Sequence, residues 1–233
     1  MKEKKVAILQ SNYIPWKGYF DLIASVDEFI ILDNVQYTKN DWRNRNKIKT
    51  RNGLQWLTIP VQTSGNFGQL INEVKVGHPS WTRKHWNSIL LSYSKAPYFK
   101  LYAEELEHIY NEIGAETYLS NINRQFIDFI CKKLNIKTSI TCSTDYAVNS
   151  SDKEDRVIQL CKVAKGTTYI SGPAAKTYIN PSNFTANGIT LEFADYSNYK
   201  PYNQLYPPFE HAVSIFDLMF QLGDSAFAYV HSE

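Results

Sequence analysis

A run of basic residues is the clearest chemical feature of this sequence. Between positions 39 and 51 it holds six cations against one acid, Asp41, in a chain of 233 residues whose formal net charge is +2. Arginine binds phosphate oxygens through paired hydrogen bonds and lysine acts as a point charge, so the run predicts a site for an anionic ligand. The residues that we expect to bind the anion are Lys39, Arg43, Asn44 and Arg45, and the run continues through Lys47, Lys49 and Arg51.

Two other interpretations of this run stay open. In a solvated edge strand, lysines discourage pairing with other chains and no ligand is involved. Single-stranded RNA is the second alternative, because arginines and an interleaved aromatic residue, Trp42, suit backbone contact and base stacking. The small net charge of the whole chain argues against a nucleic acid as the partner.

The turn "QSNYIPWKG", residues 10–18, is the second candidate ligand site. It joins an apolar run, "VAIL", to a helical pattern, and a helix N-terminus offers free N–H groups that favour a phosphate. We expect Tyr13 and Trp16 to stack on a base or a sugar. The alternative is a packed surface turn in which both rings only cover the core. The ligand-binding candidates in this turn are Gln10, Tyr13, Trp16, Lys17 and Gly18.

Three residues are candidates for the catalytic step. Asp33 ends the apolar run "EFIIL" and is placed to orient an amine, and His85 in "RKHWNS" is a second candidate base. Ser171 and the backbone N–H of Gly172, in "TYISGPAAKTYI", are candidates for an oxyanion site. Structural alternatives remain: Asp33 as the cap of the following turn, and His85 as a satisfied polar residue.

Several familiar sites are absent from the sequence. The five histidines show no HxH, HxxxH or HExxH spacing, and the three cysteines form no CxxC pair, so we expect no metal site. The sequence lacks GxSxG, GxGxxG and GxxxxGK[ST]. The short apolar run at the N-terminus, the lack of an apolar stretch of membrane-spanning length and the odd number of cysteines together predict a cytoplasmic protein without a membrane partner.

The elements that position these residues alternate between strands and helices. Runs at 5–9 and 28–33 read as strands on either side of a helix that begins at Gly18, the pattern of two parallel neighbours. We expect further strands at 54–61, 71–76, 138–146, 167–172 and 189–196. Helices are expected at 154–166, closed by Gly166, and at 213–223, ending at Gly223. Residues 81–134 have helical periodicity, broken at Pro97.

This pattern predicts a single α/β domain, residues 1–233, with a Rossmann-like, mostly parallel sheet and a mainly helical insertion at residues 81–134. The segments "QSNYIPWKGYFDLIASVDEFIILDNVQYTKNDWRNRNKIKT", "WLTIPV", "YISGPAAKTYI" and "VSIFDLMFQLG" resemble the WbqC-like family. The resemblance covers nearly the whole chain. It implies a place in bacterial surface-polysaccharide (O-antigen, lipopolysaccharide) biosynthesis, where members have been suggested to attach amino-acyl groups to amino sugars.

The resemblance therefore implies an amide-forming transferase. Its partners would be a nucleotide-linked amino sugar and a small carboxylic or amino acid, the latter activated by ATP or as a coenzyme A thioester. The alternative is a non-catalytic subunit that presents the sugar nucleotide to another enzyme. The turn is also similar to that of nucleotidyltransferases with a HxGH motif, but only Gly18 matches in "WKGY", which leaves adenylyl transfer without its two histidines.

Overall fold

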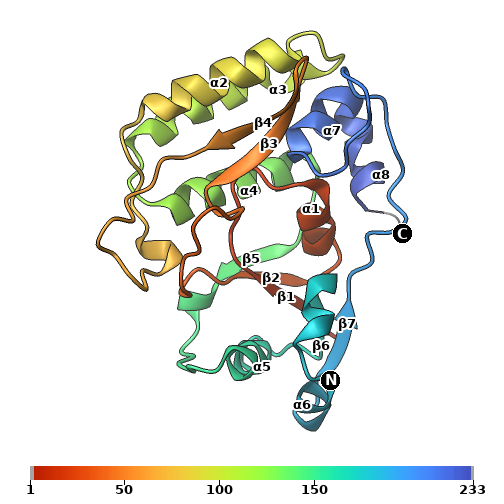
Figure 1. The fold of residues 1–233 in the computed structure, drawn as a ribbon. Coiled ribbons are helices and arrows are strands. Elements are labelled where there is room, and N and C mark those ends of the chain that lie inside the picture. The colour runs from red at the N-terminus through yellow and green to blue at the C-terminus, as the bar shows by residue number, and fades with distance from the viewer. Residues whose placement is uncertain (1–2, 232–233) are drawn as a thin grey trace.

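Strand β1 lies at the centre of a five-stranded parallel sheet in which the order of strands is β5-β2-β1-β6-β7 (Figure 1). The computed structural model describes residues 3–231. The strands are β1 (Lys5–Leu9), β2 (Glu28–Ile31), β5 (Ser139–Cys142), β6 (Thr168–Ser171) and β7 (Thr190–Phe193). Counted along the chain, this order is 3-2-1-4-5, as in the first five strands of a doubly wound sheet. The predicted α/β class is confirmed.

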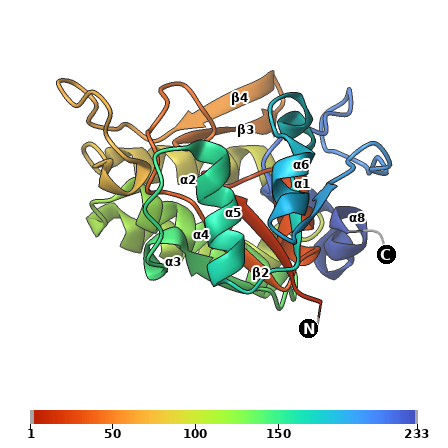
Figure 2. The ribbon, with the colours of Figure 1, turned by 90° about the horizontal axis from the view of Figure 1, so that it is seen from below.

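The sheet is covered on both faces, because alternate side chains of its strands enter two separate cores. Ala7 and Phe29 belong to the larger core, whereas Val6 and Ile30 belong to the smaller one. Helices α5 and α6 cover the smaller core, as seen from below in Figure 2. The helices are α1 (Lys17–Ala24), α4 (Leu119–Lys133) and α7 (Ile215–Leu222) on the larger core, and α5 (Lys153–Val163) and α6 (Pro181–Ala186) on the smaller.

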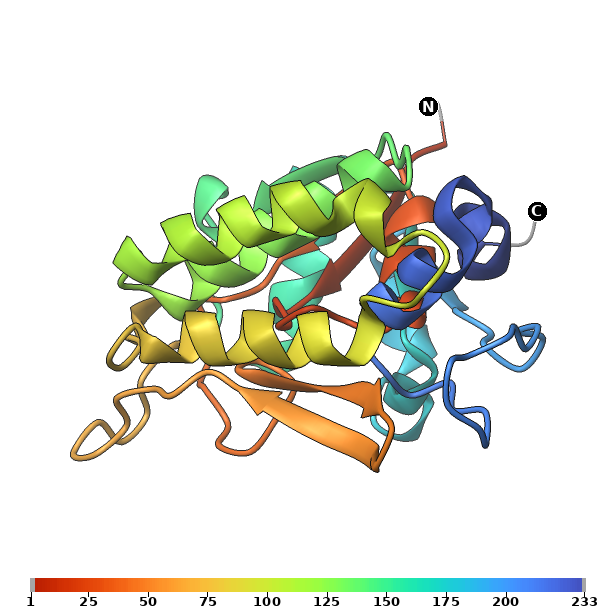
Figure 3. The same cartoon turned by 90° about the horizontal axis from the view of Figure 1, so that it is seen from above.

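A two-stranded antiparallel hairpin lies apart from the main sheet, beside α2 (Figure 3). Helices α2 and α3 run side by side in the same view, and both contribute to the larger core. The remaining elements are β3 (Arg45–Thr50), β4 (Gly53–Thr58), α2 (Ser80–Tyr93), α3 (Phe99–Glu112) and α8 (Phe227–Val230), with short 3₁₀ turns at 71–73, 113–115, 143–145, 173–177 and 223–226.

Three expectations about local structure need correction. The segment 71–76 is a 3₁₀ turn followed by isolated bridges from Lys75 and Val76, and the N–H groups of Ile71 and Asn72 bond to the irregular segment after β2 instead of to a strand. The strand expected at 54–61 exists as β4, but it pairs with β3 and not with the main sheet. Gly166 does not supply the left-handed residue after α5, which is Lys165 with φ 58°. A Cβ on Gly166 would instead lie 2.7 Å from a Val6 methyl carbon, so close packing requires this glycine.

A long irregular segment, residues 194–214, connects β7 to α7, and we call it the strap. Loops longer than about 12–15 residues without secondary structure are uncommon in compact domains and are usually functional. The strap is fastened by its own side chains: Tyr199 donates to Asp21 (2.6 Å), Tyr202 to Asp217 (2.8 Å) and Tyr206 to the Ser92 carbonyl (3.1 Å). Within residues 3–231 no helix is both long and apolar enough to cross a membrane.

Candidate functional site

Asp33 is the centre of a buried polar cluster where β1 and β2 end. Asp33 is only 5% exposed. Its carboxylate accepts hydrogen bonds from the Ser11 backbone N–H (2.8 Å) and the Ser11 hydroxyl (2.7 Å). The Ser120 hydroxyl, in the first turn of α4, also donates to Asp33. Anions are favoured at the start of a helix, so α4 adds to the stabilisation of this carboxylate. Ser120 is half-buried, so it is more accessible than Asp33 and Ser11.

Arg43 lies directly beside this cluster and faces the turn after β1. Its guanidinium donates to the side-chain oxygens of Asn12 and Gln10, the latter at 3.2 Å, and Asp41 lies 3.6 Å away. Asn123 joins the two groups, because its amide donates both to the Ser11 hydroxyl and to the Arg43 carbonyl, each at 2.9 Å. The predicted anion-binding arginine and the predicted catalytic carboxylate are therefore brought together at one edge of the sheet.

The start of α1 is covered rather than open. The Trp16 indole lies over Gly18, where an added Cβ would approach it to 2.3 Å, and it meets the rings of Tyr196 and Tyr199 edge-on at 5.2 and 5.9 Å. Gly18 is thus required by the packing of Trp16. Lys17 is only 3% exposed, and burial lowers the pKa of its amine from 10.5 to about 8, although the charge of Asp21 opposes this shift.

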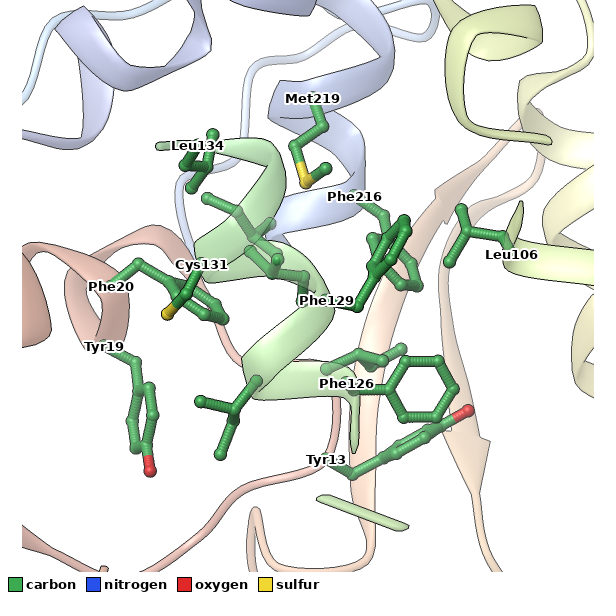
Figure 4. Packing of buried hydrophobic residues seen from close by; sticks show 14 of the residues in the cluster. Tyr13, Tyr19, Phe20, Leu106, Phe126, Phe129, Cys131, Leu134, Phe216 and Met219 are labelled. Carbon is green, nitrogen blue, oxygen red and sulfur yellow. The ribbon is translucent and has the colours of Figure 1, made fainter. Parts of the chain in front are cut away.

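Tyr13 and His85 are core residues in this structure, which corrects their expected roles. Tyr13 is fully buried and packs against Phe126 (Figure 4), so its ring offers no surface for stacking on a ligand. Its hydroxyl bonds to His85 Nδ1 (2.9 Å) and to the Tyr110 hydroxyl (2.7 Å). Burial lowers the pKa of His85 to about 4, and a hydrogen bond with the Thr58 backbone opposes this shift. The hydrogen bonds with the Tyr13 hydroxyl and the Thr58 backbone hold His85 inside the core, away from a substrate.

The rest of the basic run divides among different surroundings. Arg45 lies over the exposed Trp56 ring at 4.3 Å and Lys47 lies 5.1 Å from the same ring. Arg43 and Arg45 therefore do not face the same way. Asn44 is buried and donates to the Ile59 carbonyl (2.8 Å), so its observed contact is with the protein and not with an accessible ligand surface. Lys39 and Arg51 are exposed, and Lys49 is buried beneath the strap, where it donates to Gln204 (2.8 Å).

Ser171 ends β6, on the far side of β1 from Asp33. Neighbouring strands lie about 4.8 Å apart, which places the ends of β2 and β6 about 10 Å from each other. Ser171 is 5% exposed, whereas a Cβ on Gly172 would meet no atom within 4 Å. Gly172 therefore borders open space at the position where the strand order reverses. The following turn is 3₁₀, not an α-helix.

Four polar residues of the cluster were not anticipated from sequence: Ser11, Asn12, Ser120 and Asn123. Asn123 carries a usable signal, because it falls among the buried residues of α4 at a position where an apolar side chain is expected. Ser11 follows a buried strand directly, which is a weaker signal. Ser120 has none, because its partner Asp33 is 87 residues away in the chain.

The cluster combines a cation, a carboxylate bonded to hydroxyls and several amide groups. That set can hold an anionic ligand and accept a proton from a group bound next to it. The structure shows no group of three or more His, Cys, Asp or Glu side chains arranged for a metal within the described residues. A shallow hollow of about 340 Å³, lined by Ala24, Asp27 and Lys137 among others, lies at the opposite edge of the sheet and is not part of this cluster.

The sheet order and the polar cluster define an α/β protein with a candidate ligand site at the carboxyl edge of its parallel strands. Residues 10–229 match the WbqC-like protein family, so this chain belongs to that family and the resemblance is confirmed. It is 48% identical over 223 residues, 96% of either chain, to a protein of Mycobacterium tuberculosis (strain ATCC 25618 / H37Rv) described as "Uncharacterized protein Rv1507c". No solved structure matches the chain.

Proposed function

We propose that this protein is a cytoplasmic transferase that forms an amide between a small carboxylic or amino acid and the amine of a nucleotide-linked amino sugar, in the synthesis of a bacterial surface polysaccharide. Its membership of the WbqC-like family is consistent with this setting. The observation that carries the proposal is the bridge made by Asn123, which bonds to the Arg43 backbone carbonyl and to the Ser11 hydroxyl and so fixes the backbone of Arg43 next to the cluster around Asp33. An anion clamp and a proton acceptor then act on one substrate.

The proposed roles follow from position. Arg43 binds the diphosphate of the sugar nucleotide, because a guanidinium forms paired hydrogen bonds with phosphate oxygens. As the amine nitrogen forms its bond to the acyl carbon, it must lose a proton. Ser120 is accessible and bonded to Asp33, so it relays that proton to the carboxylate while the leaving group departs from the acyl carbon. Ser171 and Gly172, across the end of β1, are the candidates for binding the acyl oxygen.

The binding half of the proposal is tested with Arg43→Ala. We expect the affinity for a UDP-linked amino sugar, measured by isothermal titration calorimetry, to fall about 10- to 100-fold, the range for losing a charged hydrogen bond. Arg51→Ala is the matched control, because Arg51 is an exposed arginine at the hairpin turn of the same basic run. Equal affinities of the two variants and the native chain would refute the clamp.

The non-catalytic alternative, a subunit that only presents the sugar nucleotide, is favoured by one observation. Asp33 is nearly covered and already accepts three hydrogen bonds, which limits its capacity as a base. Mass spectrometry of the sugar nucleotide after incubation with purified protein, glycine and ATP, or with an acyl-coenzyme A, separates the two functions. An added acyl group would exclude the alternative, and binding without turnover under every donor would support it.

A further inference from the structure

Lys17 is a buried cation whose surroundings are unusual. Its amine makes one long hydrogen bond in the described structure, to the Lys200 carbonyl at 3.4 Å, and it lies 4.3 Å from the centre of the Tyr199 ring. Among residues 3–231 no carboxylate oxygen lies within 4.0 Å of it. Asp21, one turn further along α1, is bonded to Tyr199 and His231 instead.

This arrangement is unfavourable for the folded protein by itself. An ammonium group loses its hydration when it is buried and is usually paired with an acid in compensation. Lys17 is also the first residue of α1, where the helix dipole is positive and disfavours a second positive charge. The rings of Tyr199 and Tyr202, 4.3 and 5.8 Å from the amine, offset part of this cost through cation–π contacts. They supply no hydrogen-bond acceptor, whereas an anion next to Lys17 would satisfy both the amine and the helix start.

His211 provides an independent indication that a ligand belongs here. Its ring lies 6.4 Å from the Tyr199 ring, which the amine of Lys17 also faces. Burial lowers the pKa of the imidazole, the charge of Lys17 lowers it further, and Glu210 opposes this shift. Its Nδ1 atom is buried and has no hydrogen-bond partner within the part of the chain that the structure describes. A buried ring nitrogen without a partner is costly, and it becomes satisfied when it donates to an oxyanion.

We propose that Lys17 and His211 form a binding site for one oxyanion, a phosphate or a carboxylate, beneath the strap. The strap must part to admit the anion, and its length and its attachment through tyrosine hydroxyls suit that movement. The site stands on the burial of Lys17 and does not depend on the proposed amide synthesis. Binding of phosphate would assign the site to a nucleotide. Binding of a carboxylate would assign it to a free carboxylic or amino acid.

Binding of an anion has a defined proton signature. The titratable or charged groups that face the amine are Asp21 of α1 and Tyr199, Tyr202 and His211 of the strap. A bound anion favours the charged forms of Lys17 and His211 and raises both pKa values. Because the pKa of Lys17 is about 8 without the anion, binding at pH 8 draws up to about half a proton per site into this amine.

The test uses the full chain and two probes, sodium phosphate and sodium acetate, with sodium chloride at equal ionic strength as the reference. We expect one probe at saturation to raise the melting temperature by about 5 °C and to cause proton uptake at pH 8, measured by calorimetry in two buffers of different ionisation enthalpy. Lys17→Met keeps the length and apolar body of the side chain and should abolish both effects. Lys100→Met, at an exposed lysine of α3 outside both proposed sites, should retain them.

Each outcome decides the matter. The site is supported when the native chain and Lys100→Met respond, Lys17→Met does not respond, and His211→Asn binds the anion at least tenfold more weakly. An unchanged response in Lys17→Met, or no response of the native chain to either anion, overturns it. Because the sugar-nucleotide experiment depends on Arg43, loss of one proposal leaves the other measurable.

Discussion

Asp33 and Lys17 are both buried ions near the end of β1, and they differ in how their charges are satisfied. Asp33 is 5% exposed and accepts three hydrogen bonds, from one backbone N–H and two hydroxyls. Lys17 is 3% exposed and has one long hydrogen bond and two tyrosine rings in the described chain. The charge of Asp33 is satisfied by hydrogen bonds within the protein, whereas Lys17 lacks an anionic partner in the described part of the chain.

The difference follows from the geometry of a parallel sheet. At its carboxyl edge the chain enters helices, and helix starts present N–H donors and a positive dipole end. Those groups serve a carboxylate such as Asp33 and oppose an ammonium such as Lys17. The same edge can therefore bury an anion with little cost and can bury a cation only at a cost, which an anionic ligand would remove.

The largest effect is expected when the supported charge is removed. Asp33→Ala leaves three donors without an acceptor, and we expect it to lower the free energy of unfolding by about 3 kcal/mol. Urea denaturation followed by circular dichroism measures the change. Asp41→Ala, which removes a more exposed carboxylate from the same edge, should cost under about 1 kcal/mol. Comparable losses from both variants would mean that Asp33 is no better supported than a surface acid.

Gly18→Ala acts on the cover of Lys17. The added methyl would lie 2.3 Å from the Trp16 ring, which is packed against Tyr196 and Tyr199, so we expect a loss of about 1–3 kcal/mol from overpacking. Gly172→Ala is the matched control, because open space and an ordinary φ of −66° leave room for its methyl. It should change the unfolding free energy by less than about 0.5 kcal/mol. A harmless Gly18→Ala would show that the Trp16 cover is loose.

Removing the charge of Lys17 should change the free energy of unfolding in the opposite direction. We expect Lys17→Met to stabilise the protein by about 1 kcal/mol at pH 7. The folded pKa of Lys17, about 8, lies below the unfolded value of 10.5, so the unfolded chain binds more protons between these values. The native chain should therefore gain stability as pH rises from about 8 to 9.5, by at most about 1.4 kcal/mol per pH unit. Unfolding curves at these pH values, compared with Lys17→Met, isolate this gain; parallel curves would contradict it.

Ser120→Ala is expected to have the smallest effect, a loss of about 1 kcal/mol for one hydrogen bond to Asp33. A double-mutant cycle sharpens the comparison, because the same substitution should cost almost nothing when Asp33 is already alanine. Additive losses would show that Ser120 stabilises the protein through other contacts. The transferase proposal adds a second expectation, that Ser120→Ala lowers turnover more than it lowers sugar-nucleotide affinity.

The sheet could be predicted from sequence because its strands are short buried runs separated by helical periodicity. Asp33 could be placed at a strand end for the same reason, whereas the proposed anion-binding role of Arg43 rests on charge and stays a prediction. The surroundings of Asp33 could not be found, because Ser120, which bonds to Asp33, and Asn123, which bonds to Ser11, lie on a helix about ninety residues away in the chain. Local patterns carry no record of such contacts.

Tyr13 and His85 were expected to contact a ligand, but both are buried. Tyr13 lies in the turn that we expected to bind a ligand, but its ring is buried in the core, and sequence does not say which way a turn residue faces. His85 is a different case, because its spacing from Trp81 and Ile89 in α2 already indicates the buried side of the helix. The burial of Lys17 depends on the strap, which begins more than 170 residues later.

The strap and the hairpin are joined by several hydrogen bonds, so a movement of one is expected to displace the other. Lys49 of β3 donates to Gln204, the Ser214 N–H donates to the Lys47 carbonyl at 2.8 Å, and Asp217 accepts from Tyr202 and also from Tyr93, whose hydroxyl in turn accepts from the Lys49 N–H. A ligand that displaces the strap therefore perturbs the strand that follows Arg43. We therefore expect the affinities of the two proposed anion sites to be coupled, and reciprocally so: each ligand would change the binding of the other by the same factor.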